Sequence, residues 1–312
     1  MLRIILLISG CILLLFQQYI LPVDAQTQFI IFLTGIVLLG VPHGAADLLV
    51  ASRNADSEKK TFSKLRFLFL YMGRLFLFAA ILWFFPLAGN LLFIIFAAYH
   101  FGETDLYHFK TNTLSGKLFV IAYGLVILCV ILLHHFEEVK PLFQLFASGK
   151  ENMAFINWLD INRYLIMSAA AGLFFVSTFA YFVNNNNFNQ KDKGQFLVRF
   201  ALILFILYNL PMLLGFTFYF VVWHAVLSLS NITAYLKNNE ALSQSTITKQ
   251  IVFYSVLAIG GIVLFGLTGF MFISSSAMMG YLFLGLAVLT APHMQIMHEM
   301  YNSIRTHGYF AK

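Results

Sequence analysis

Apolar runs of about twenty residues recur along the whole chain, and they restrict its fold more than any other feature. They cover roughly residues 3–22, 27–51, 66–88, 90–108, 117–136, 163–183, 196–214, 216–236, 250–274 and 278–300. A helix needs about 20 apolar residues to cross the hydrocarbon of a bilayer, and only 10% of the 312 residues are charged. The sequence predicts an all-α, polytopic membrane bundle of about ten transmembrane helices, forming one integral membrane domain over residues 1–312.

The basic residues predict how this bundle is oriented. In the ten-helix topology, fifteen of the nineteen Lys and Arg residues lie on one side and three on the other, and Arg74 lies inside a helix. Because cytoplasmic loops are enriched in Lys and Arg, both termini are predicted to be cytoplasmic. The longest connection, about Glu137–Asn162, then lies outside. The net charge of +6 is spread over short loops, so no nucleic-acid partner is expected, and no obligate protein partner is evident.

Two local features bear on the helix ends. Residues 1–26 have a basic start, an apolar run and a Val23–Gln26 segment that resembles a signal-peptidase site. The run is long for a signal peptide, so a retained first helix is predicted, with a cleaved signal peptide as the alternative. Short turns at Pro86–Asn90 and at Gly215 predict tight antiparallel helix hairpins.

Histidines lie at similar depths in four of the predicted helices. Counted from the predicted cytoplasmic ends, they are about 7 to 12 residues deep at a rise of 1.5 Å per residue: His43, His100, His224 and His293. Ionisable residues at such depth are costly and usually mark sites. Neutral imidazole is the commonest metal ligand, and bundles assemble metal sites from different helices. The layer predicts a metal centre, although each histidine taken alone could simply be hydrogen-bonded in the core.

Polar and aromatic neighbours extend this prediction. Asp47 lies one turn after His43 and is expected to orient it. Glu103 and Asp105 are candidates for the same role beside His100, or are solvated at the membrane surface. In the eighth predicted helix, a polar stripe should face protein rather than lipid: Thr217, His224, Ser228 and Asn231.

Several imidazoles with open positions suit non-haem Fe(II), although Zn, Cu and Ni also accept imidazole. Aromatic side chains near the histidines are candidates for the wall of a long apolar pocket, or are ordinary packing residues: Phe93, Phe96, Phe220 and Trp223.

At these histidines the sequence resembles the Brp/Blh family of bacterial membrane β-carotene 15,15'-dioxygenases. The matching segments are Gly-Val-Pro-His-Gly-Ala-Ala-Asp (40–47), His-Phe-Gly-Glu-Thr-Asp (100–105), Trp-His (223–224) and Ala-Pro-His-Met (291–294). The resemblance implies a multi-pass enzyme of the bacterial inner membrane. It implies that Fe(2+) and O2 are used to split the central double bond of β-carotene, or of a related carotenoid, into retinal. The carotenoid would reach the site from the membrane lipid.

The resemblance also implies a ligand set. His43, His100 and His224 match iron ligands, but Ser228 stands where the family has a second histidine in the eighth helix. The fourth ligand is then His293, which matches a family histidine, or His298, which looks additional. These two point about 140° apart on a regular helix, so only a distorted helix would bring both to one ion, and a three-histidine site is also acceptable.

No catalytic residue beyond the ligands is implied. The competing functions are a membrane oxygenase for a different carotenoid or lipid, and a non-enzymatic haem- or metal-binding membrane protein.

Overall fold

A computed structural model describes residues 1–146, 150–184, 190–237, 243–272 and 278–307, and these ranges contain helices and no strand. The first half of the chain forms α1 (Leu2–Leu15), α2 (Ala25–Gly35), α3 (Val41–Ala45), α4 (Asp47–Ser57), α5 (Lys64–Phe84), α6 (Pro86–Asp105), α7 (Leu114–Cys129) and α8 (Phe136–Phe146). The second half forms α9 (Lys150–Asn184), α10 (Gln190–Asn209), α11 (Met212–Phe216), α12 (Ala225–Lys237), α13 (Gln244–Phe272) and α14 (Met278–His307). The predicted all-α class is confirmed.

Short π-helical segments continue several of these helices. They are Phe16–Ile20 after α1, Ile36–Gly40 between α2 and α3, Val130–His134 after α7 and Thr217–His224 between α11 and α12. π-Helical turns are rare and are often found at functional sites. Two of them flank histidines of the predicted metal centre, since one ends three residues before His43 and another ends at His224.

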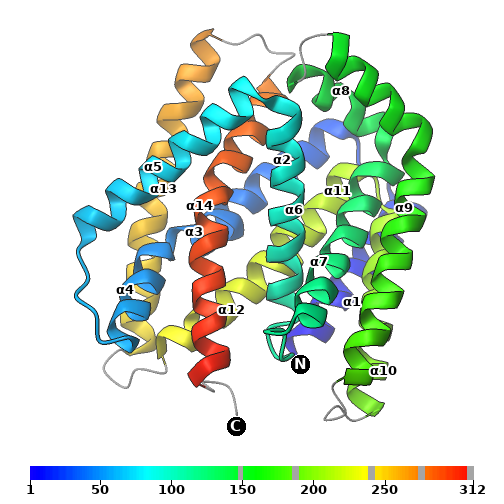
Figure 1. Cartoon of the computed structure of the whole chain (residues 1–312). Helices are drawn as coiled ribbons and strands as arrows, with labels where there is room; N and C mark the ends of the chain where they lie inside the picture. Colours follow the sequence, from blue (N-terminus) through cyan, green and yellow to red (C-terminus); the bar gives the residue numbers. More distant parts are fainter. Residues whose placement is uncertain (147–149, 185–189, 238–242, 273–277, 308–312) are drawn as a thin grey trace.

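The surface of the bundle is that of a multi-pass membrane protein. Seven helical segments among the described residues are long and apolar enough to cross a bilayer: Leu2–Ile20, Ala25–Ser57, Lys64–Phe84, Leu114–His134, Asn152–Asn184, Met212–Lys237 and Gln244–Leu264. On α5 alone, Phe69 and Trp83 expose more than three quarters of their surface. The total of about ten spans stays a prediction, with α6, α10 and α14 as the further helices. The start of α1 and the end of α14 lie at the same end of the bundle (Figure 1), which the basic residues predict to be cytoplasmic.

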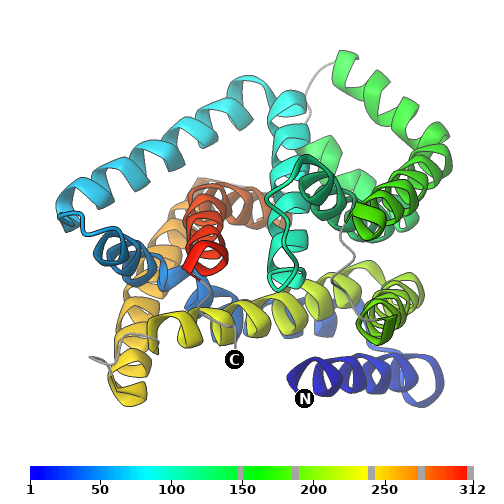
Figure 2. The same cartoon turned by 60° about the horizontal axis from the view of Figure 1, so that its bottom comes forward.

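Prolines shift both predicted hairpin turns. α5 ends at Phe84 and α6 begins at Pro86, because proline is well suited to the first turn of a helix. Likewise, α10 ends at Asn209 and α11 begins after Pro211, so Gly215 lies inside a helix and not in the turn. α5 also leaves α6 at an angle instead of packing along its whole length (Figures 1 and 2).

The predicted outer loop Glu137–Asn162 is largely helical. α8 occupies its beginning and α9 starts at Lys150. Ion pairs hold the two helices together, since the Lys140 Nζ lies 2.7 Å from the Asp160 Oδ2 and the Arg163 guanidinium lies 3.0 Å from Glu137. Several of the polar residues that suggested a loop are thus the residues that pair α8 with α9.

Helices α6 and α7 pack with their backbones almost in contact. A Cβ atom at Gly102 would overlap the carbonyl of Val120, and one at Gly124 would overlap the carbonyl of Ala98. Only glycine allows so close an approach. Because Gly102 is two residues after His100, this contact fixes the part of α6 that carries the histidine.

Viewed from one end of the bundle, α14 is enclosed by α4, α5, α6 and α12 (Figure 2).

Candidate metal centre

The four histidines of the predicted layer converge at the centre of the bundle. They come from α3, α6, the π-helical segment before α12, and α14, and none exposes more than 5% of its surface. The ring centres are 5.6 Å apart for His43 and His224 and 4.7 Å apart for His43 and His293. They are 4.7 Å apart for His100 and His224 and 5.2 Å apart for His100 and His293. The rings therefore form a closed, edge-to-face cycle.

This spacing suits a shared ion. Two imidazoles that ligate one metal through nitrogens about 2.1 Å away have ring centres roughly 4.5–5.5 Å apart when the angle between them at the metal lies between 90° and the tetrahedral angle. Three of the four spacings lie in this range, and the 5.6 Å between His43 and His224 lies just above it. Both ring nitrogens of His100 and His224, and Nε2 of His293, are buried and have no hydrogen-bond partner in the described structure. Leaving such groups unpaired costs about 1–3 kcal/mol each. A shared metal ion would bind one nitrogen of each ring, and water would pair the others.

The histidine donors are not already aimed at one point. Within the described ranges, no three His, Cys, Asp or Glu side chains are arranged so that they could hold a metal as they stand. A proposal of a metal therefore rests on the ring spacing, the burial and the unpaired nitrogens.

Asp47 orients a different histidine from the one predicted. Its Oδ1 lies 2.7 Å from Nδ1 of His293, and its Oδ2 accepts a hydrogen bond from the Tyr71 hydroxyl at 2.9 Å. α3 ends at Ala45 and Ala46 has a ψ of −5°, so the regular spacing between His43 and Asp47 is broken. Asp47 consequently faces α14, where it fixes one nitrogen of His293, and Nε2 stays buried without a partner in the described structure.

His298 lies outside the histidine cycle. Its Nδ1 is 3.0 Å from Glu103 Oε1, its Nε2 is 2.8 Å from the amide nitrogen of Asn302, and 38% of its side chain is exposed. Glu103 also pairs with Arg305. This carboxylate, predicted to serve His100, instead ties α6 to the end of α14. α14 is regular between His293 and His298, so only His293 reaches the centre.

Asp105 also holds partners other than His100. It accepts hydrogen bonds from the Tyr123 hydroxyl at 2.7 Å, the Tyr219 hydroxyl at 3.1 Å and the Trp223 indole at 2.9 Å. All three donors and Asp105 are buried. Since Trp223 directly precedes His224, this carboxylate positions the helix that carries His224. The fourth predicted polar neighbour, Ser228, is fully buried one turn after His224, beside the Tyr301 hydroxyl.

We expect Asp105→Ala to destabilise the protein severely. It would leave three buried donors unpaired, each at a cost of about 1–3 kcal/mol. Thermal unfolding of the detergent-purified protein measures this effect. The matched control is Asp160→Ala at the α8–α9 ion pairs, where side chains are partly exposed and a loss of at most about 1 kcal/mol is expected. Equal unfolding temperatures for the two variants would contradict the role given to Asp105.

Aromatic side chains surround the histidines unequally. The Phe220 ring stacks on His224 with centres 6.0 Å apart and meets His43 edge-on at 6.4 Å. Phe101, which the sequence did not single out, lies 4.8 Å from the His224 ring. Trp223 points to Asp105. Phe93 packs against Phe78, with ring centres 6.3 Å apart.

Phe96 lies in a groove beside the histidine cycle. The groove lies between α5, α6 and α14. Its volume is about 530 Å³, including the space at its open side. Apolar side chains make most of its wall: Phe78, Ile81, Leu92, Phe96, Ala291 and Pro292. Ala291 and Pro292 immediately precede His293. None of the four histidines lines this groove, which lies beside the segment of α14 that carries His293.

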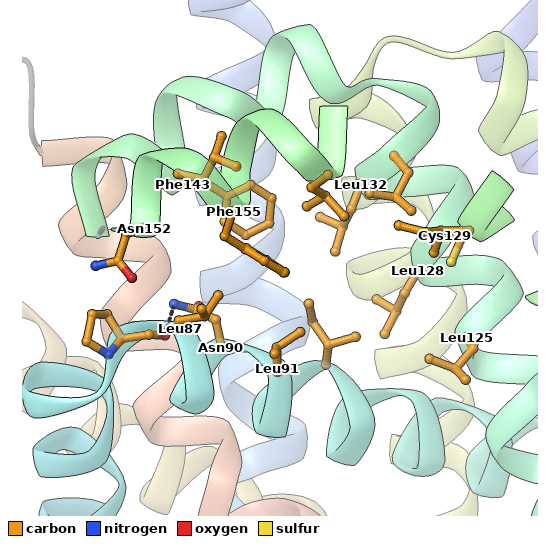
Figure 3. A pocket seen from close by; sticks show the side chains of 16 residues that line it. Leu87, Asn90, Leu91, Leu125, Leu128, Cys129, Leu132, Phe143, Asn152 and Phe155 are labelled. Atoms are coloured by element: carbon orange, nitrogen blue, oxygen red, sulfur yellow. Dashed lines mark hydrogen bonds between the residues drawn. The ribbon is translucent and has the colours of Figure 1, made fainter. Parts of the chain in front are cut away.

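A second pocket lies away from the histidines. It is formed by α6, α7, α8 and α9 and encloses about 900 Å³, with a lining that is almost wholly apolar (Figure 3). α6 contributes Leu87, Leu91 and Ile94. His100 is six positions after Ile94, so the two point to different faces of α6 at about 100° per residue. None of the aromatic residues predicted to line a substrate pocket belongs to it.

Comparison with known proteins gives the same family that the histidine-containing segments resemble. The family model of β-carotene 15,15'-dioxygenase matches residues 34–301, which include all four converging histidines. The chain is 27% identical over 264 residues to a β-carotene 15,15'-dioxygenase from an uncultured marine bacterium 66A03, covering 83% of this chain and 89% of that protein. No solved structure is significantly similar. The chain therefore belongs to the β-carotene 15,15'-dioxygenase family.

Proposed function

We propose that this protein is a non-haem iron dioxygenase of the bacterial inner membrane that cleaves the central 15,15' double bond of β-carotene into two molecules of retinal. The observation that carries the proposal is the buried cycle of four histidines at ring spacings that suit one ion. Family membership supports the reaction, and the groove beside His293 supports an apolar substrate that comes from the lipid.

We propose His43, His100, His224 and His293 as the ligands, with His293 as the fourth. Four neutral imidazoles would leave the charge of Fe(II) unneutralised, and the bound metal would supply O2 activation at its remaining positions. The chain itself positions the ligands. Tyr71 and Asp47 orient His293, and Asp105 positions the segment that carries His224.

The surrounding residues would also exclude water and align the polyene. Phe220 and Phe101 cover the rings of His224 and His43 on one side. The apolar wall of the groove between α5, α6 and α14 contains no carboxylate. A long hydrocarbon held in such surroundings would be cut at whichever double bond lies beside the metal, so positioning decides the site of cleavage.

Expression in bacteria that accumulate β-carotene, followed by extraction and chromatography of the pigments, tests the proposal. We expect retinal with the unaltered protein and its loss in His43→Ala and His224→Ala at equal protein levels. Bleaching that yields aldehydes of other lengths would favour a different cleavage position or carotenoid. Unchanged β-carotene at normal protein levels would refute the proposed function, and a Soret band in the purified protein would indicate haem instead.

A further inference from the structure

Arg74 is placed where a charged side chain is most costly. It lies ten residues from each end of α5 (Lys64–Phe84), one of the helices long and apolar enough to span a membrane. Ten residues correspond to about 15 Å of helix, so Arg74 is at the middle of the span. Arginine at the centre of a bilayer is rare, faces protein or a cavity, and needs a partner.

The side chain of Arg74 lines the groove beside the histidine cycle. Within the part of the chain that the structure describes, it has no hydrogen bond or ion pair, whereas Arg163 and Arg305 both bind carboxylates. The other polar residue of the groove wall, Gln295, donates its amide to Glu299 at 3.1 Å. The guanidinium carries five N–H donors and no acceptor. Apart from Arg74 and Gln295 the groove wall is apolar, and within the described structure no hydrogen bond joins the Gln295 side-chain oxygen to Arg74.

These properties define the ligand that the groove would hold. It must be apolar along most of its length and carry an oxygen acceptor at the level of Arg74. The proposed reaction creates such a molecule, because one C=C bond and O2 give two C=O groups. The hydrocarbon substrate has no acceptor. The new carbonyl forms beside the histidines, and Arg74 shares the groove with Pro292, the neighbour of His293.

We infer that this groove is the product site, in which the Arg74 guanidinium donates a hydrogen bond to the carbonyl oxygen of a retinal-type aldehyde. The inference rests on the proposed function and assigns Arg74 to binding rather than to the cleavage step. It also gives α5 a reason to diverge from α6 (Figure 2), because the gap lets one cleaved half leave sideways into lipid.

Ligand binding to the purified full-length protein in detergent tests the inference. Retinal and a C20 polyene hydrocarbon without oxygen are titrated separately, and quenching of the fluorescence of the three tryptophans is followed. Arg74→Met keeps a flexible, unbranched side chain and removes the guanidinium donors. We expect it to weaken retinal binding about tenfold, which is typical of a lost hydrogen bond to a charged group, and to leave hydrocarbon binding unchanged.

Arg66→Met is the matched control, because Arg66 is exposed two turns earlier on the same helix. It should leave the binding of both ligands unchanged. Retinal affinity unchanged in Arg74→Met, or equal weakening for both ligands, would overturn the inference. Assaying β-carotene cleavage with the same preparations separates the two proposals. If the protein cleaves β-carotene but Arg74→Met binds retinal as tightly as the unaltered protein does, the product site alone is refuted. If Arg74→Met weakens the binding of retinal only, but the unaltered protein does not cleave β-carotene, the proposed function alone is refuted.

Discussion

Replacing His293 with alanine is expected to lower the iron content of the purified protein more than about tenfold, since even residues that only orient metal ligands change metal affinity by 10–100-fold. Nε2 of His293 is buried and unpaired, and Nδ1 is fixed by Asp47 at 2.7 Å. The Asp47 contact thus fixes the His293 ring, whose centre lies 4.7 Å from that of His43, and leaves one nitrogen free. Elemental analysis of protein purified after growth with iron measures the effect.

His298→Ala is the matched control, five residues later on the same helix. Both nitrogens of His298 already have partners, Glu103 and Asn302. We therefore expect this variant to retain its iron and to lose only part of the contact between α6 and α14. Loss of iron from His298→Ala with retention in His293→Ala would reverse the choice of the fourth ligand. Iron kept by both variants would favour a three-histidine site.

Gly124→Ala is expected to prevent α6 and α7 from packing. The new methyl group would meet the backbone of Ala98, which cannot rotate away as a side chain would. Overpacking of this kind costs about 1–3 kcal/mol, and more where the backbone must shift. The helix segment that carries His100 would move with it. The yield of monodisperse protein after extraction and its unfolding temperature measure the effect.

Gly172→Ala controls for the substitution itself. Gly172 lies in α9 and has open space where a Cβ would be placed. Because alanine favours the helix by about 0.5–1 kcal/mol over glycine, this variant should be as stable as the unaltered protein or slightly more so. A Gly124→Ala protein that unfolds at the same temperature as Gly172→Ala would show that the close contact of α6 and α7 is not needed.

The sequence was sufficient to predict the positions of the helices, because the pattern that predicts a membrane helix lies within the helix itself. Runs of apolar residues of spanning length predict membrane helices without knowledge of neighbours, and each of the ten predicted ranges overlaps a helix of the structure. The errors arose where local signals compete. Pro86 begins α6 and Pro211 directly precedes α11, so both helices begin earlier than predicted, and the described polar residues of 137–162 belong to α8 and α9 instead of a loop.

Hydrogen-bond partners could not be predicted in the same way. Tyr71, Tyr123 and Tyr219 lie in apolar helices with no local sign of a role, yet they donate to Asp47 and Asp105. Spacing along one helix suggested that Asp47 serves His43, but the break at Ala46 turns it to α14. Contacts between helices depend on crossing angles and on the direction of each side chain, which one helix alone does not determine.

The sequence by itself determined the all-helical class, the apolar surface and four histidines at similar depths, because each depends on the order of residues along single helices. Only the tertiary structure decided that these histidines converge, that His293 rather than His298 joins them, and that Arg74 faces a groove beside them. The physical reason is that depth along a helix follows from counting residues. The face that a helix turns towards its neighbours follows from packing, and here the glycines of α6 and α7 and the buried carboxylates fix that packing.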